Sequence, residues 1–169
     1  MALIFLLLAA ATGPGWLDIP YVHQKGAGCG AAAVAMVIQY WARQQPSLAG
    51  AAAESERINE ELQASAKGIQ GTALKSYLEA RGFDVFVFRG ERSDLEQQFK
   101  KGRPLVVCLG PKGAHGPFHY AVVAGIDREA VWLNDPARGK LIREDLRRFE
   151  AAWKESDHWS LLAVPRQQR

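Results

Sequence analysis

The sequence lacks the features that mark proteins binding nucleic acids or nucleotides. Its net charge is only +3, and its lysines and arginines are scattered rather than gathered into a run interleaved with aromatic residues. It has no glycine-rich loop followed by Lys-Ser or Lys-Thr, the pattern that cradles nucleotide phosphates. We therefore expect neither a nucleic acid nor a nucleotide as a partner.

Hydrophobic runs long enough to span a membrane are missing as well. The N-terminal run Leu3–Ala11 is too short to cross a bilayer as a helix. Residues 1–12, MALIFLLLAAAT, resemble the hydrophobic part of a secretory signal, with Ala9 and Ala11 at a cleavage site but without a positively charged start. We expect export to the periplasm or the exterior, and membrane contact only through this segment if it is retained. The alternative is that it forms an apolar element of the fold.

Repeats, linkers and low-complexity segments are also absent, so residues 16–169 are expected to form one domain, and the protein a monomer. Cysteine is scarce, with only Cys29 and Cys108. An exported protein could join two cysteines in a disulfide. However, Cys108 lies in PLVVCL, which is typical of a buried strand, and we expect it to be a reduced core residue.

The stretch QKGAGCG at Gln24–Gly30 precedes an apolar run, AAAVAMVIQYW, that has no charge, glycine or proline. A run this apolar on nearly every face predicts a buried helix. Cys29 then lies at or just before the first turn, where unpaired N–H groups and the helix dipole favour a thiolate. The alternative is that Cys29 is simply a small residue packed beside glycines.

The rest of the chain predicts helices first and then mostly strands. Helices are expected at 51–66, from a cap at Thr72 to about Gly82, from a capping box of Ser93 and Glu96 to Gly102, and at 144–153. Strands are expected at 83–88, 104–109, 119–126, 130–134 and 159–164. This order predicts an α+β fold in which a helical half, containing the buried helix of Cys29, packs on an antiparallel sheet.

A thiolate nucleophile needs a base, and four histidines are available. His119 opens the predicted strand HYAVVAGI, where a side chain is held firmly, whereas His115 lies in a glycine-rich loop. The i, i+4 spacing of His115 and His119 suits zinc only on a helix, which Gly116-Pro117 opposes, so we expect no metal and no cofactor. The alternative for His119 is a strand-edge histidine bonded to backbone.

The imidazole also needs a group that orients it. His119 begins one strand of a predicted hairpin, and Asp135 follows the end of the next, so antiparallel pairing makes them spatial neighbours. The alternative for Asp135-Pro136 is plain turn chemistry.

Taken together, IPYVHQ, GCGAAAVAM, FHYAVVAGID and WLNDP resemble the C39 family of papain-like cysteine peptidases, from about Asp18 to the C-terminus. The resemblance implies a papain-like fold in which Cys29 is the nucleophile, His119 the base and Asp135 its orienting group. It also implies that Gln24 helps to form the oxyanion hole. The Gln24–Cys29 separation is five residues, where papain-like enzymes often have six, and His23 would give six.

The resemblance implies hydrolysis of a peptide or protein substrate, and two alternatives stay open. One is a papain-fold acyltransferase that passes the acyl group to an amine or thiol. The other is a non-catalytic peptide-binding module, against which the full Cys-His-Asp set argues. Family members fused to peptide-exporting transporters cut leaders after Gly-Gly, but this sequence contains no ATP-binding motif, so the substrate itself stays open.

Overall fold

The computed structural model describes residues 15–51, 54–62, 68–111 and 116–167, so the predicted leader at 1–12 and His115 lie outside the described residues. The helices are α1 (Cys29–Gln44), α2 (Ser55–Glu61), α3 (Gly71–Glu79), α4 (Arg92–Lys100) and α5 (Leu146–Lys154), with a 3-10 turn η1 at Pro46–Ala51. The strands are β1 (Phe83–Arg89), β2 (Leu105–Leu109), β3 (His119–Ile126), β4 (Ala130–Asp135), β5 (Gly139–Asp145) and β6 (Trp159–Pro165). Over these residues the strands form one antiparallel sheet in the order β1-β6-β2-β3-β4-β5. The predicted α+β architecture is confirmed.

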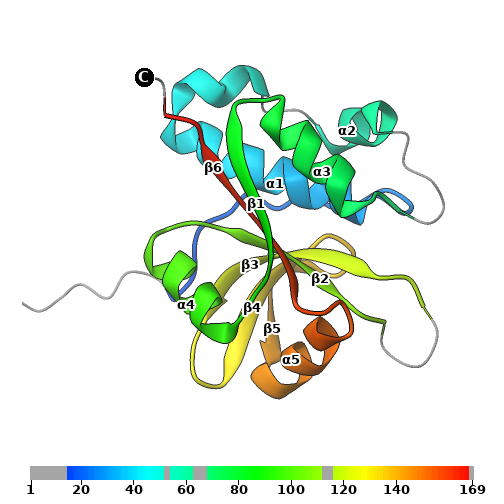
Figure 1. Ribbon diagram of the computed structural model, residues 1–169, viewed down its shortest axis with the longest axis vertical. Helices are drawn as coiled ribbons and strands as arrows, with labels where there is room; N and C mark the ends of the chain where they lie inside the picture. Colours follow the sequence, from blue (N-terminus) through cyan, green and yellow to red (C-terminus); the bar gives the residue numbers. More distant parts are fainter. Residues whose placement is uncertain (1–14, 52–53, 63–67, 112–115, 168–169) are drawn as a thin grey trace, which may run out of the picture.

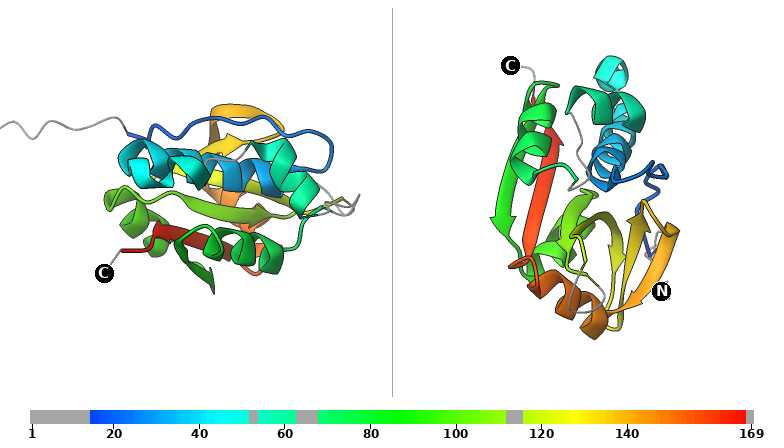
Figure 2. Two further views of the ribbon diagram at one scale, coloured as in Figure 1. Left: turned by 90° about the horizontal axis from the view of Figure 1, so that it is seen from above. Right: turned by 90° about the vertical axis from the view of Figure 1, so that its right-hand side faces the viewer.

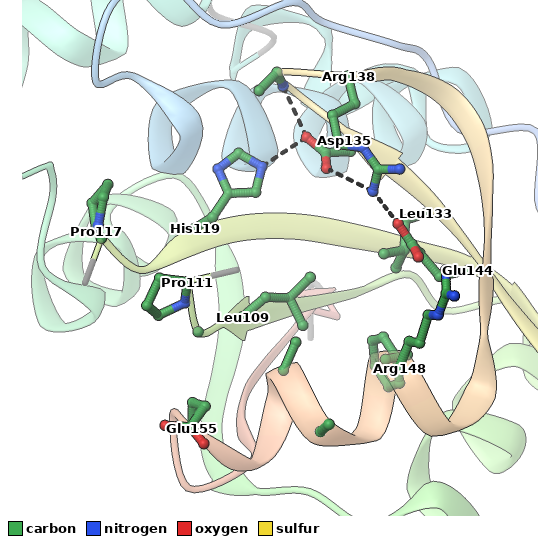
Figure 3. A pocket seen from close by; sticks show the side chains of 16 residues that line it. Leu109, Pro111, Pro117, His119, Leu133, Asp135, Arg138, Glu144, Arg148 and Glu155 are labelled. Atoms are coloured by element: carbon green, nitrogen blue, oxygen red, sulfur yellow. Dashed lines mark hydrogen bonds and ion pairs between the residues drawn. The ribbon is translucent and has the colours of Figure 1, made fainter. Parts of the chain in front are cut away.

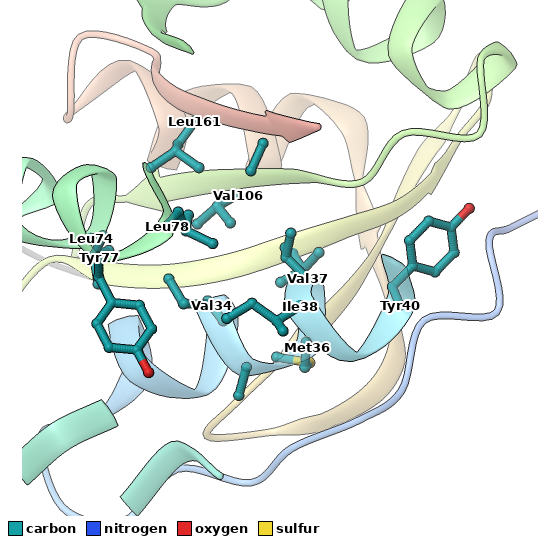
Figure 4. Close-up of a cluster of buried hydrophobic side chains, with 14 of the residues drawn as sticks. Val34, Met36, Val37, Ile38, Tyr40, Leu74, Tyr77, Leu78, Val106 and Leu161 are labelled. Carbon is teal, nitrogen blue, oxygen red and sulfur yellow. The ribbon is translucent and has the colours of Figure 1, made fainter. Parts of the chain in front are cut away.

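Helix α1 is the centre of the helical half, as its apolar sequence predicts. Every residue from Ala31 to Ile38 is at most 1% exposed. The helix packs on β3 and β6 of the sheet and is covered on its other sides by η1, α2 and α3. Figure 4 shows side chains of α1 meeting those of α3, with Val106 of β2 and Leu161 of β6 beside them. A helix this apolar is stable here because nearly all faces of its first turns are removed from water.

The sheet divides the hydrophobic core into two clusters. One lies between the sheet and α1 with α3, and the other lies between the sheet and α4 with α5, around Leu133, Phe149 and Trp153. Figures 1 and 2 show α1–α3 gathered beside β1 and β6, while β4 and β5 curl away toward α5. The two halves therefore meet where α1 begins and β3 begins.

Strand β5 was not expected, and it corrects the prediction of a helix over 144–153. Residues 139–145 form an edge strand paired with β4, and α5 begins only at Leu146. The strand is half-exposed without a clean alternation, and Gly139 and Leu141 both have positive φ. Because its residues do not alternate between buried and exposed, the strand leaves no period-2 signal in the sequence. Only its pairing with β4 identifies it as a strand.

Two helix starts also differ from the predictions. Helix α4 begins a residue earlier than Ser93, because the capping box is formed by Glu91 and Asp94 rather than by Ser93 and Glu96. Helix α3 has Gln70 at its N-cap, with no side-chain cap, so Thr72 lies within the helix. In both helices the predicted inward residues are nevertheless buried, among them Leu74 and Leu95, because the 3.6-residue period does not depend on the cap.

The predicted helix over 51–66 is reduced to α2, with 52–53 and 63–67 outside the described residues. Its inward side chain Ile58 is fully buried, as expected for an amphipathic helix. Among the described residues, no helix is both long and apolar enough to cross a membrane.

Candidate active site

Cys29 is the first residue of α1, and Gly28 occupies the N-cap without any side-chain cap. The first N–H groups of the helix therefore lack intrahelical partners and point toward the thiol end of the helix. Gly30 lets the sheet approach, since a Cβ there would come within 3.2 Å of the Tyr120 ring and 3.3 Å of Leu74. Cys29 is only 8% exposed, wedged between the helix start and β3.

His119 and Asp135 come together from the adjacent strands β3 and β4, as Figure 3 shows. The imidazole Nε2 lies 2.7 Å from Oδ1 of Asp135, whose side chain is 4% exposed. The same Oδ1 accepts the backbone N–H of Ala137 at 2.9 Å, which fixes the carboxylate. Because Nε2 is engaged with the carboxylate, Nδ1 is the ring nitrogen left to interact with the Cys29 thiol, and the two groups shift each other's pKa.

The electrostatics of this trio favour a separated charge pair. Burial opposes ionisation of Cys29, but the hydrogen bond to His119, the N–H groups of Tyr120 and Gly30 and the imidazolium charge together lower the pKa of the thiol. Burial likewise opposes protonation of His119, yet hydrogen bonds and charges of Asp135 and Cys29 raise its pKa to about 9. Both shifts are in the direction that favours a thiolate facing an imidazolium.

Asp135 is held by a residue that the sequence did not single out. Burial would raise the pKa of its carboxyl, but the hydrogen bond and charge of His119, the Ala137 N–H and the charge of Arg138 lower it. The Arg138 guanidinium lies 3.8 Å from Oδ2 and also pairs with Glu144. The only signal in the sequence was the i, i+3 spacing of an acid and a base across a turn.

The extended segment before α1 places Gln24 beside this turn. Its backbone N–H donates to the Pro136 carbonyl at 3.0 Å, and the Tyr21 hydroxyl lies 3.3 Å from the carbonyls of both Asp135 and Pro136. Asn134, fully buried, ties the same segment to β4 by donating to the Ile19 carbonyl at 3.1 Å. The sequence offered no hint of these cross-links, since the bonded groups lie more than 110 residues apart.

The Gln24 side chain lies in the turn that leads to the helix. Its Nε2 donates to the Gly26 carbonyl at 2.7 Å, which leaves a second amide hydrogen for another acceptor. On the other side of the turn the Asn59 amide of α2 packs so closely on Gly28 that a Cβ there would lie 2.4 Å from Nδ2. Gln24 Oε1 and Asn59 Oδ1 are both buried without a hydrogen-bond partner in the described part of the chain.

The other cysteine and the other described histidines have different partners or a raised pKa. Cys108 is a buried free thiol on β2, and burial together with the Cys29 charge raises its pKa to about 12. His158 pairs with Glu150, and His23 is exposed with its Nδ1 3.4 Å from the Tyr21 hydroxyl. Within the described ranges, no group of three or more His, Cys, Asp or Glu side chains is arranged to hold a metal ion.

A pocket of about 940 Å³ opens beside His119 and Asp135, between the ends of β2 and β3 and helix α5. Apolar side chains from Leu109, Leu133 and Phe149 line it, and charged side chains stand around them. The His119–Asp135 pair therefore lies beside a pocket of the size that binds ligands.

Comparison with known proteins places the chain in a family. The Peptidase_C39 like family matches residues 16–160. The lactococcin-G-processing and transport ATP-binding protein LagD of Lactococcus lactis subsp. lactis is 26% identical over 131 residues. That match covers 78% of this chain but only 17% of LagD, so this chain spans a small part of that relative.

Three solved structures share the fold. A structure from Bacillus anthracis described as a C39-like peptidase has a TM-score of 0.70 at 18% identity, covering 90% of this chain and 99% of that one. The peptidase domain of Streptococcus ComA has a TM-score of 0.69 at 20% identity, covering 86% and 98%. A double glycine motif protease from an AMS/PCAT transporter, in complex with its leader peptide, has a TM-score of 0.66 at 21% identity, covering 90% and 95%. Since the family match extends over most of its length, the chain belongs to the Peptidase_C39 like family.

Proposed function

We propose that this protein is a cysteine peptidase that hydrolyses a peptide bond through an acyl-enzyme on Cys29. The observation that carries the proposal is the position of the His119 imidazole, which lies 2.7 Å from the Asp135 carboxylate and close enough to Cys29 for each to shift the pKa of the other. A lowered thiol pKa and a raised imidazole pKa are what nucleophilic catalysis by cysteine needs. The family and the fold support the same reaction class.

In the proposed reaction, the Cys29 sulfur attacks the carbonyl carbon and the carbonyl π electrons move to oxygen. The tetrahedral intermediate collapses as His119 gives its proton to the leaving amine, which breaks the C–N bond and leaves a thioester. His119 then takes a proton from water, whose oxygen attacks the thioester to release the acid and the thiolate. Asp135 keeps the imidazole oriented throughout.

The developing oxyanion needs donors that are already in place. We assign this role to the Cys29 backbone N–H, which is free at the helix start, and to the second amide hydrogen of Gln24. The hydrogen bond from Gln24 to the Gly26 carbonyl would hold the amide in the turn, at no cost of reorganisation during the reaction. Both donors are uncharged, so neither would disturb the adjacent ion pair.

The substrate that this proposal implies is a peptide or protein segment. A structurally similar protease has been solved with a leader peptide bound, which supports a peptide occupant here. The same acyl-enzyme could be passed to an amine instead of water, and product analysis in the presence of glycylglycine would separate hydrolysis from transfer. A new amide product exceeding the free acid would make this chain an acyltransferase.

The experiment that tests the reactive centre is intact-mass analysis during incubation with iodoacetamide near neutral pH. We expect rapid single labelling of the wild type, loss of that label in Cys29→Ala, and unchanged labelling in Cys108→Ser. Labelling of Cys29 as slow as that of free cysteine would overturn the proposed nucleophile and favour a peptide-binding module. Hydrolysis of a random peptide library by wild type and not by Cys29→Ala would complete the test.

We also propose that the protein is exported, which rests on residues 1–12 alone. Fractionation of the producing cell and N-terminal sequencing of the product test this. Accumulation of the chain in the cytoplasm, beginning at its first residues, would contradict it.

A further inference from the structure

The pocket beside His119 and Asp135 is lined by charged as well as apolar side chains. One wall is a single face of α5 and its C-cap. Arg148, Ala151 and Ala152 of the helix and the C-cap residue Glu155 form it, spaced i, i+3, i+4 and i+7. The two alanines have short side chains and leave space in the middle of this wall. Opposite charges stand at its two ends, and Figure 3 shows Arg148 and Glu155 at opposite ends of the helix face.

These two charges are not neutralised by neighbours in the described part of the chain. Seven residues of α-helix separate them by about 10.5 Å along the axis, too far for a direct ion pair. Arg138, the other arginine of the pocket, pairs with both Asp135 and Glu144. Neither Arg148 nor Glu155 has an ion-pair partner among the described residues, and both side chains are exposed at the pocket.

The opposite wall is apolar and close to the reacting groups. Leu109, Pro111 and Pro117 come from the end of β2 and the approach to β3, and Phe149 and Leu133 close the bottom. The volume of about 940 Å³ is at the upper end of the range of about 300–1,000 Å³ typical of ligand sites. His119 lies in the same lining, so an occupant of the pocket lies beside the proposed base.

We propose that this pocket is a substrate subsite that takes the peptide segment beside the scissile bond. It would prefer an acidic side chain opposite Arg148 and a basic side chain opposite Glu155. Neighbouring side chains of an extended peptide face opposite ways, so only residues an even number of positions apart can both face α5. The separation of about 10.5 Å is nearest to positions i and i+4, about 13 Å apart at about 3.3 Å per residue, and the flexible Arg148 and Glu155 side chains can cover the difference. This assignment rests on the proposed peptidase function, because it is the reaction at Cys29 that makes the occupant a substrate.

Charge reversal tests the subsite in the full chain. Cleavage of a random peptide library, mapped by mass spectrometry, should show an acid and a base four positions apart on one side of the cut. Arg148→Glu should lower kcat/KM for such peptides by about fivefold or more, because an attraction is replaced by a repulsion. The double variant Arg148→Glu/Glu155→Arg should reverse the charge order that is preferred. Arg147→Glu, on the same helix but outside the pocket lining, is the matched control.

A binding measurement separates failure of the subsite from failure of the peptidase proposal. Fluorescein-labelled peptides containing Asp-Ala-Ala-Ala-Lys or Asn-Ala-Ala-Ala-Gln are titrated into Cys29→Ala protein and followed by anisotropy. Tighter binding of the charged probe that is lost in Cys29→Ala/Arg148→Glu supports the subsite even where wild type cleaves nothing. Equal binding of both probes, or cleavage by wild type with no charge preference and equal effects of Arg147→Glu and Arg148→Glu, would overturn it.

Discussion

The substitution Asp135→Asn separates the two contributions that this side chain makes to His119. Oδ1 accepts both the His119 Nε2–H and the Ala137 N–H, so an asparagine would keep its carbonyl oxygen in that place. Its NH₂ group would then take the place of Oδ2 and face the guanidinium of Arg138, donor against donor. The orientation of the imidazole is therefore largely kept, while the negative charge is lost.

The size of the effect follows from the pKa of His119, which is raised from 6.5 to about 9. That difference corresponds to about 3 kcal/mol in favour of the imidazolium, at about 1.4 kcal/mol for each tenfold change. Burial works against it, and Asp135 and Cys29 supply the favourable part. Attributing about half of the net to Asp135, its loss makes protonation of His119 roughly tenfold weaker.

The sign of the pH effect is fixed by which form acts. His119 must hold its proton to protonate the leaving amine, so activity falls as pH rises through its pKa. Asp135→Asn lowers that pKa, and we expect the alkaline limb of kcat/KM to move down by about one pH unit, so that activity falls roughly tenfold at pH values above the wild-type limb and little near neutral pH. This is far less than the loss of about 10⁴ known for the equivalent change in a serine-protease triad, where the charge stabilises a newly formed imidazolium.

The assay is the pH profile of kcat/KM on a peptide cleaved by the wild type, with thermal unfolding followed by circular dichroism. Asp127→Asn is the matched control, since that carboxylate caps the other end of the same hairpin through Glu129 and Ala130. The fold should be retained in both variants. An alkaline limb that stays in place, with unchanged turnover, would refute the assignment of Asp135 as the orienting group.

Three further experiments probe the surroundings of the nucleophile. Gln24→Ala should cost about 10²–10³ in kcat while thiol labelling persists, and His23→Ala should do far less; the reverse ranking in steady-state kinetics would move the oxyanion role to His23. Thiol titration of the purified monomer, denatured without reductant, should give two free thiols, whereas none would mean that Cys108 forms a disulfide and that this form is inactive. Gly28→Ala should lower kcat and the melting temperature, because its Cβ would meet the Asn59 amide at 2.4 Å; unchanged values of both would show that the turn yields easily.

The sequence by itself determined the elements whose signals are local. The buried helix α1, the strand His119–Ile126 and its hairpin partner follow from hydrophobic period and turn residues, and the structure has them within a residue or two. The neighbourhood of His119 and Asp135 also followed, since a two-stranded antiparallel hairpin leaves only one way for the strands to lie side by side.

Tertiary structure alone decided the features that depend on distant pairing. Strand β6, last in the chain, enters the sheet between β1 and β2, and β5 is a strand only because β4 lies beside it. The place of β6 depends on pairing with strands that are distant in sequence, and β5 is an edge strand with mixed burial that has no period of its own.

The surroundings of the candidate site also depend on contacts between residues that are distant in sequence. Gln24 reaches the Asp135 turn through hydrogen bonds that cross more than 110 residues of sequence, and Arg138 backs the carboxylate from the far side. Helix α5 lines the pocket because the curvature of the sheet brings the helix beside the ends of β2 and β3. Local pattern records which face of an element is apolar, whereas the groups that meet across the sheet are set by register and packing, which no short stretch encodes.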